Sequence, residues 1–266
     1  MAVYVVTSTW YSEPGVRADL ALETARSAVE LGYVMIVVDG GKSYQGFQEA
    51  MEETGAEFYV QEKLGMDAAR LQGLLEAYER VGPKDAVVWM EPEKVDFVRS
   101  IPVLVAPILS GRANMAIPIR KSMSSYPPVQ RHTETAARLM VNDIVGGGID
   151  LDEFFGPFAI DKRALKYVVS FDPEKYGIHP DRVGWLRNHA PRLEILADSA
   201  LVVREVKIPY IHPCEQTKEE TGVLAWHMKR ITQLDNLIPA LWLIGYELGL
   251  TDQLPPYSLR VQLMQE

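Results

Sequence analysis

Short apolar runs alternate with segments of helical periodicity along the N-terminal part of the chain. Strands are predicted where β-branched and aromatic side chains are concentrated, at residues 2–10, 34–38, 56–61 and 87–90. Helices are predicted where apolar side chains recur at helical spacing, at residues 17–31, 47–54 and 67–81. Because strands alternate with helices, the pattern predicts an α/β fold with a parallel sheet built by right-handed crossovers.

The rest of the chain has a less regular pattern. Further strands are predicted within residues 113–119, 152–160 and 201–211. Helices are predicted over residues 133–144, from residue 161, and over 217–250. Pro239 is expected to kink or divide the last helix, because a proline inside a helix lacks the N–H donor and collides with the preceding turn.

Composition and charge narrow the class of protein. Hydrophobic residues make up 47% and charged residues 24% of the 266 residues, as in ordinary globular proteins. The formal net charge of −9 disfavours a nucleic-acid binder, which would normally carry a basic surface. The single cysteine, Cys214, excludes a disulfide within the chain. Neither a secretory leader nor about 18 consecutive apolar residues is visible, so we expect a cytoplasmic protein.

Two glutamates directly follow the fourth predicted strand. Glu91 and Glu93 are separated by Pro92, and both can point to the same side because side chains alternate along an extended chain. Two neighbouring carboxylates repel each other unless a cation lies between them. The pair therefore indicates Mg²⁺ or Mn²⁺ bound together with a phosphate. The alternative is a solvated Glu-Pro-Glu-Lys turn.

Two more polar residues are expected at the same edge of the sheet. Asp39 ends the second strand, where parallel sheets bind their ligands, although an aspartate there can also cap a turn. Arg70 lies in the first turn of a helix, where a cation is unfavourable. A pyrophosphate between Arg70 and the helix N-terminus would remove this conflict. A solvated or ion-paired arginine is the alternative.

Three motifs occur in order along the chain: Val-Val-Asp39-Gly-Gly-Lys-Ser, Gly65-x-x-x-Ala-Arg70-x-x-Gly and Val-Val-Trp-Met-Glu91-Pro-Glu. This order resembles the family 2 glycosyltransferases and related enzymes of the GT-A fold, including retaining enzymes similar to mannosylglycerate synthase. The resemblance covers residues 3–95, with a weaker echo at residues 156–165. It implies a GT-A-like three-layer α/β sandwich with a mostly parallel central sheet.

The resemblance also implies roles for individual residues. Thr7 and Asp39 would contact the donor, Asp39 at its nucleoside, and Arg70 would bind the pyrophosphate. Glu91 and Glu93 would hold the ribose and a divalent metal. The family has aspartates at these two acidic positions. Because each glutamate reaches one methylene further, the metal preference and the activity itself stay open.

His212 ends the last predicted strand. The retaining enzymes that the chain resembles place a metal-binding histidine after their final strand, so the resemblance makes His212 a third metal ligand. An imidazole beside carboxylates would favour Mn²⁺ over Mg²⁺. The alternative is a histidine that is hydrogen-bonded to a backbone carbonyl.

The acceptor side is less clearly marked. A base for the acceptor hydroxyl would be a carboxylate, and the candidates are Glu153, Asp161 and Asp181, each of which also reads as an ordinary surface residue. Arg120 and Arg131 flank a Ser/Pro-rich loop and would bind a charged acceptor, unless that loop is simply solvated.

Together these features predict one GT-A-like domain over residues 1–266. Residues 1–95 would bind the nucleotide-sugar, residues 96–215 the acceptor, and residues 216–266 would pack on the sheet or on a second copy. The expected activity is metal-dependent transfer of a hexose from a UDP- or GDP-sugar to a small or lipid-linked hydroxyl acceptor. The alternatives are a sugar-nucleotidyltransferase and an inactive nucleotide-sugar-binding or scaffold protein.

Overall fold

A computed structural model describes residues 1–179 and 184–255 of the chain. Strands and helices alternate through its first part in the predicted order: β1 (Val3–Thr9), α1 (Val16–Glu30), β2 (Val34–Asp39), α2 (Phe47–Glu52), β3 (Glu57–Val60), α3 (Met66–Arg80) and β4 (Ala86–Trp89). Two helices that the sequence pattern did not predict follow, α4 (Val95–Val98) and α5 (Ile101–Leu109). The second part contains β5 (Met115–Arg120), α6 (Pro128–Ile144), η1 (Glu153–Phe155), β6 (Phe158–Ile160), α7 (Lys162–Val169), η2 (Pro173–Tyr176), η4 (Leu186–Asn188), α8 (Ala190–Ala197), β7 (Val203–Ile208), α9 (Cys214–Glu220) and α10 (Leu224–Glu247).

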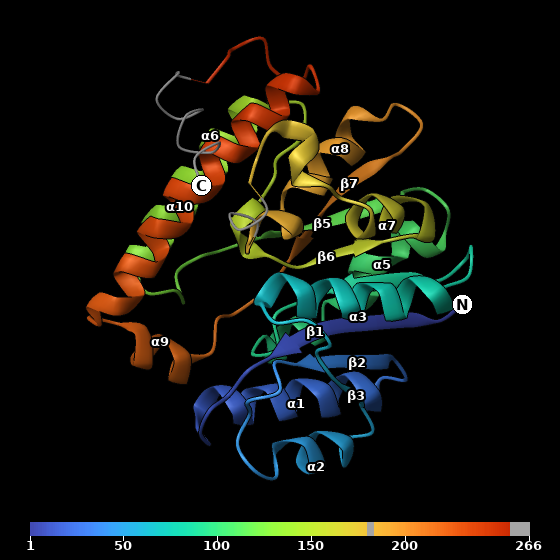
Figure 1. Cartoon of the computed structure of the whole chain (residues 1–266), viewed down its shortest axis with the longest axis vertical. Helices are drawn as coiled ribbons and strands as arrows, with labels where there is room; N and C mark the ends of the chain where they lie inside the picture. Colours follow the sequence, from blue (N-terminus) through green and yellow to red (C-terminus); the bar gives the residue numbers. More distant parts are fainter. Residues whose placement is uncertain (180–183, 256–266) are drawn as a thin grey trace.

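The described strands form one seven-stranded sheet with the order β3-β2-β1-β4-β6-β5-β7 (Figure 1). Neighbouring strands run parallel except for β6, which is antiparallel to both β4 and β5. The mostly parallel sheet that the sequence predicts is therefore confirmed.

Helices cover both faces of the sheet and make three layers. On one face lie α3, α7 and α8, and the long helices α6 and α10 run side by side there (Figure 1). The other face is covered by α1, α2 and α5. Strand β1 serves both cores, because Val6 points to the first and Val5 to the second. Strands buried on both faces read as continuous apolar runs, which explains why the sequence pattern predicted the sandwich correctly.

Two helix boundaries differ from the sequence-based prediction. Helix α6 begins at Pro128 and not at residue 133, because proline suits the first helical position, where its missing N–H is not needed. The C-terminal helical segment is not divided at Pro239, which lies inside α10. The division comes at Gly222, whose φ of 77° is a left-handed conformation that glycine adopts readily.

The carboxyl ends of β1, β2 and β4 meet at one edge of the sheet, because these strands are parallel and adjacent. Helix α9 and the N-terminal turns of α10 lie beside this edge (Figure 1). In open α/β sheets, ligands bind at this edge, so the fold brings the C-terminal helices to the expected binding region. Among the described residues, none of the helices has both the length and the apolar character required to cross a membrane.

Candidate active site

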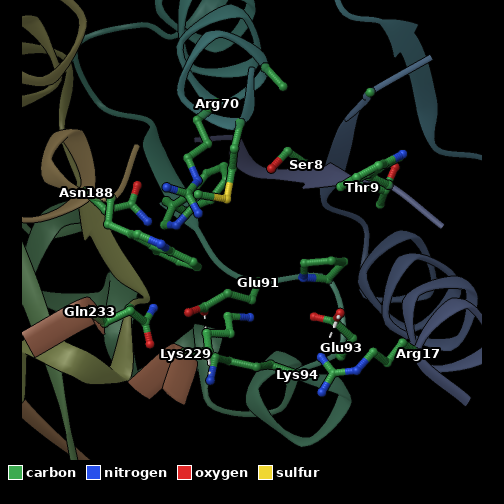
Figure 2. A pocket seen from close by; sticks show the side chains of 18 of the residues that line it. Ser8, Thr9, Arg17, Arg70, Glu91, Glu93, Lys94, Asn188, Lys229 and Gln233 are labelled. Carbon is green, nitrogen blue, oxygen red and sulfur yellow. Dashed lines mark ion pairs between the residues drawn. The ribbon is translucent and has the colours of Figure 1, made fainter. Parts of the chain in front are cut away.

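A cavity of about 740 Å³ lies at the carboxyl edge of the sheet. One part of its wall comes from the strand ends, with Ser8 and Thr9 on β1 and Glu91 just after β4. Helix α3 contributes Arg70, and α10 contributes residues 229, 230 and 233. Figure 2 labels all of these side chains except that of residue 230 and shows the labelled ones around one space, although they come from segments far apart in the sequence.

Glu91 is held in place at the cavity wall. Its carboxylate lies against Gly156, where a Cβ atom would overlap Glu91 Oε1. Gly156 also has a φ of 96°, which other residues rarely adopt. The ion-pair partner of Glu91 is Lys94, whose Nζ lies 3.8 Å from Oε2. Oε2 is buried and accepts no hydrogen bond from the described residues, so it is available to a ligand hydroxyl.

Glu93 is tied to the residues around helix α1. The Tyr11 hydroxyl donates to Glu93 Oε1 at 3.1 Å, and Arg17 Nη1 lies 3.5 Å from the same oxygen. Burial, and then the charge of Glu93, raises the pKa of Tyr11, so the phenol keeps its proton and its hydrogen bond. Protein groups therefore already engage the carboxylate of Glu93 (Figure 2).

Arg70, the fifth residue of α3, enters the cavity on the side opposite Glu91 (Figure 2). Its guanidinium lies over the rings of Trp185 and Trp89, at 4.4 and 5.6 Å from their centroids, and Nη1 donates to the Gly184 carbonyl at 2.7 Å. Burial lowers its pKa to about 10, so it stays charged at neutral pH. Nε is buried without a hydrogen-bond partner among the described residues, and an anion would satisfy it.

Other cations line the same cavity, and we refer to three of them, Lys94, Lys229 and Arg230, as the cation cluster. Lys94 follows β4, and its side chain is only 12% exposed. Lys229 and Arg230 come from α10. The sequence analysis missed both α10 residues, because it treated that helix only as a packing element.

His212 is buried in the cavity wall and stacks on Tyr126, with 4.3 Å between ring centroids. Neither ring nitrogen has a hydrogen-bond partner among the described residues, so the alternative of a carbonyl-bonded imidazole is not observed. Burial, and then the charges of Lys94 and Arg230, lowers the pKa of His212 to about 3. The imidazole is therefore neutral and lies in a region of positive potential.

On the acceptor side, Glu153 is buried and does not line the cavity itself. It is hydrogen-bonded to Nδ1 of His189 at 2.7 Å, and Arg192 Nη1 lies 3.2 Å from its other oxygen. His189 does line the cavity, and the bond to Glu153 leaves its Nε2 for a ligand. Burial lowers the pKa of His189, so the imidazole is neutral at pH values near 7 and can accept a proton. The sequence-based prediction made Glu153 itself a candidate base and did not include His189, which is the residue of this pair that lines the cavity.

The similarity of this chain to known proteins lies in its structure. No family model matches the chain, and no curated protein matches its sequence significantly. A mycobacterial protein of known structure has 17% sequence identity and a TM-score of 0.59, over 88% of this chain and 74% of its own. Mannosyl-3-phosphoglycerate synthase from Rubrobacter xylanophilus has 15% identity and a TM-score of 0.56, over 96% of this chain and 77% of its own. The chain has a GT-A-like fold. Identities this low establish the fold alone.

A GT-A-like fold implies a divalent metal beside the acidic pair, but the residues present do not fit one. Within residues 1–179 and 184–255, no group of three or more His, Cys, Asp or Glu side chains could hold a metal ion. The structure does not join Glu91, Glu93 and His212 into one ligand set. Glu91 is paired with Lys94, and Glu93 is paired with Arg17. The positive charges around His212 lower its pKa.

Two residues that were predicted to contact the donor do not line the cavity. Asp39 is buried outside the cavity lining and accepts hydrogen bonds from Thr9 Oγ1 at 2.8 Å, Ser43 Oγ at 2.5 Å and the Gly41 amide at 2.8 Å. It therefore shapes the turn after β2, as the turn-capping alternative predicts. Thr7 is buried in β1 and does not line the cavity either.

The remaining predicted residues that the structure describes, Asp161, Arg120 and Arg131, do not line the cavity. Asp161 caps α7 by accepting from the Ala164 amide at 2.8 Å. Arg120 is buried in an ion-pair network with Asp152 and Glu134, at 2.5 and 2.6 Å. Arg131, on α6, is not a lining residue, and Asp181 lies outside the described residues.

Proposed function

We propose that this protein transfers a glycosyl group from a nucleoside-diphospho-sugar to a hydroxyl acceptor. The observation that carries the proposal is the pair of unsatisfied groups across one cavity: the Nε donor of Arg70 and the Oε2 acceptor of Glu91. An anionic diphosphate suits the first, and a sugar or ribose hydroxyl suits the second. A hexose is supported by the mannosyl-3-phosphoglycerate synthase that shares the fold.

The strand ends provide a place for the nucleoside. Gly40 follows β2 and the Trp10 side chain packs against it, and both line the cavity together with Gln61 after β3. Trp10 is 66% exposed, so its ring is open to stacking with a base. With the nucleoside there, the diphosphate would reach Arg70 and the sugar would lie near Glu91.

The transfer breaks the bond between the anomeric carbon and a diphosphate oxygen. Negative charge grows on the departing diphosphate, and Arg70 with the cation cluster would stabilise it. The same carbon forms a bond to the acceptor oxygen, whose proton has to leave. We assign this proton to Nε2 of His189, with Glu153 as the positioning residue that holds the ring through Nδ1.

The space beside Glu91 can be tested by replacing Gly156 with alanine. A Cβ there would force the Glu91 carboxylate away, and the positive φ adds about 1–3 kcal/mol of strain. We expect glycosyl transfer to fall by at least about tenfold, since the freed carboxylate no longer faces the sugar. Gly111→Ala is the matched control, because Gly111 has a φ of 70° and open space around it. Equal activity of the two variants would contradict the placement of Glu91.

Donor affinity is expected to weaken at alkaline pH. Burial, and then the guanidinium charges of Arg230 and Arg17, lowers the pKa of Lys229 to about 8, while Glu93 and Glu220 act in the opposite direction. Above this pH the free protein loses the proton that a bound diphosphate requires. Affinity should therefore fall about tenfold between about pH 7 and pH 9.

The arginine and glutamate charges near Lys229 do not change in this pH range. Lys94, whose pKa burial also lowers, can only add to the fall. Calorimetric titration with a nucleoside-diphospho-sugar checks this, because its diphosphate keeps the same charge. The Lys229→Met variant should flatten the profile, and an equally steep profile in that variant would assign the proton elsewhere.

The products distinguish transfer from the alternatives. The protein is incubated with UDP-, GDP-, ADP- and dTDP-sugars, and separately with nucleoside triphosphates plus sugar 1-phosphates. We expect a nucleoside diphosphate to be released slowly by hydrolysis and faster with a suitable hydroxyl acceptor. Pyrophosphate release from the second mixture would identify a nucleotidyltransferase. Donor binding without any release would identify a scaffold protein.

A further inference from the structure

The cation cluster has little compensating charge in its own protein. Lys94 pairs with Glu91 at 3.8 Å, and Arg230 lies 3.6 Å from Glu220 and 3.9 Å from Glu134. All three separations exceed the usual length of a charge-assisted hydrogen bond. Lys229 forms no ion pair with the described residues.

Much of the contact around these cations is aromatic. Lys94 Nζ lies 4.5 Å from the ring centroid of Phe155 and 5.3 Å from that of Tyr210. Lys229 Nζ lies 4.7 Å from the ring of Trp226. Aromatic faces stabilise a cation without neutralising it, so the positive charge remains available to a ligand.

Besides its long ion pairs, Arg230 has a hydrogen-bond donor without a partner among the described residues. Its Nε is buried and lacks a hydrogen-bond partner within the described parts of the chain. A buried donor of this kind costs stability unless a ligand or water completes it. Together with Nε of Arg70, two guanidinium groups of one cavity each have a buried Nε donor left over for an anion.

The same charges make the site a poor place for a divalent ion. A metal between Glu91 and His212 would lie close to Lys94, whose Nζ is 3.8 Å from Glu91 Oε2, in the cavity that Arg230 also lines. Like charges at short range repel strongly in a partly buried site. The glutamate that a metal would need next, Glu93, is already paired with Arg17.

We propose that Lys94, Lys229 and Arg230 bind and neutralise the donor's diphosphate in place of a divalent metal ion. This rests on the proposed function, because it assigns the diphosphate of that donor to the cluster. Lysine and arginine donors would then make the contacts to phosphate oxygens that a metal makes elsewhere. The divalent-metal requirement that the family resemblance implies would not apply to this chain.

Calorimetric titrations in EDTA test the inference with three probes: UDP, GDP and inorganic pyrophosphate. We expect at least one nucleoside diphosphate and pyrophosphate to bind in EDTA, and the nucleoside diphosphate to gain less than about twofold when Mn²⁺ replaces EDTA. Lys94→Met and Lys229→Met should each weaken binding about ten- to a hundredfold. Lys84→Met is the matched control, because Lys84 is exposed and precedes β4, at the opposite end of the strand from Lys94.

The outcomes separate this inference from the proposed function. Binding or turnover that requires Mn²⁺ or Mg²⁺, or unchanged affinity in both lysine variants, would overturn the cluster and leave the transferase intact. Pyrophosphate binding in EDTA without turnover of any nucleotide-sugar would overturn the transferase instead. If pyrophosphate binds at the same time as a nucleoside diphosphate, the cation cluster does not bind the donor's diphosphate. That result would overturn the inference and assign the cluster to a phosphate of the acceptor. The Lys229 residue as a whole is exposed, although its ammonium group lies in the cavity wall beside the Trp226 ring, so its variant should fold even if Lys94→Met does not.

Discussion

Replacing His189 with glutamine should lower kcat by about 10²- to 10⁴-fold while leaving donor affinity unchanged, because the imidazole is assigned the proton of the acceptor hydroxyl. Glutamine can keep the hydrogen bond to Glu153 but cannot take up a proton at neutral pH. Initial rates of nucleoside diphosphate release at saturating donor and acceptor measure this. His132→Gln is the matched control, since His132 is exposed on α6.

The pH profile distinguishes a base from a structural histidine. Burial lowers the pKa of His189 below its usual range near 6.5, so the wild-type rate should rise with pH through a value below 6.5 and then level off. The hydrogen bond and the negative charge of Glu153 act against burial and raise the pKa of His189. Glu153→Gln should therefore shift the rising limb to lower pH and reduce the plateau, because the imidazole becomes a weaker base. A profile that does not move in Glu153→Gln would contradict the pairing.

Replacing Arg70 with methionine should lower kcat/KM for the donor by about 10²- to 10³-fold, because the guanidinium is placed on the departing diphosphate. Methionine keeps apolar contact with Trp185 and Trp89, so the loss should reflect charge and hydrogen bonding. Arg80→Met, in the last turn of the same helix, is the matched control. A fall of similar size in Arg80→Met, or no fall in Arg70→Met, would contradict the assignment.

The sequence predicted the edge of the sheet at which the cavity lies, and the reason is local. Apolar runs buried on both faces mark the parallel strands, and the residues that follow such strands must lie at their carboxyl edge. Glu91 was found in this way, and Arg70 was found because a cation in the first turn of a helix is unfavourable without an anion. Both line the cavity.

Asp39 lies at the same edge but is not among the residues that line the cavity. Its carboxylate is engaged by the hydroxyls of Thr9 and Ser43 and by the Gly41 amide. Each of these partners is a short polar group near a strand end, and the sequence pattern alone does not say which of them an aspartate will meet. The capping alternative was visible from the motif, and the structure agrees with it.

The cations from α10 could not be placed from the sequence. Lys229 and Arg230 follow Glu91 by more than a hundred residues, and no periodicity records how α10 packs beside α6. His189 lies in a stretch of short 3₁₀ turns without a regular pattern. These residues are brought to the site by tertiary packing. The metal hypothesis rested on the acidic motif, on His212 and on the family resemblance, and it did not include these charges.

The proposed donor site at Arg70 is tested by the binding of a nucleoside-diphospho-sugar. UDP-, GDP-, ADP- and dTDP-sugars are screened by thermal denaturation of the wild type and of Arg70→Met, with and without Mn²⁺. At about 100 times its Kd, a donor adds roughly 2.7 kcal/mol of stability, or several degrees of Tm in a chain of this size. We expect such a shift with at least one donor in the wild type and its loss in Arg70→Met. No shift with any donor, or a shift that Arg70→Met leaves intact, would contradict it.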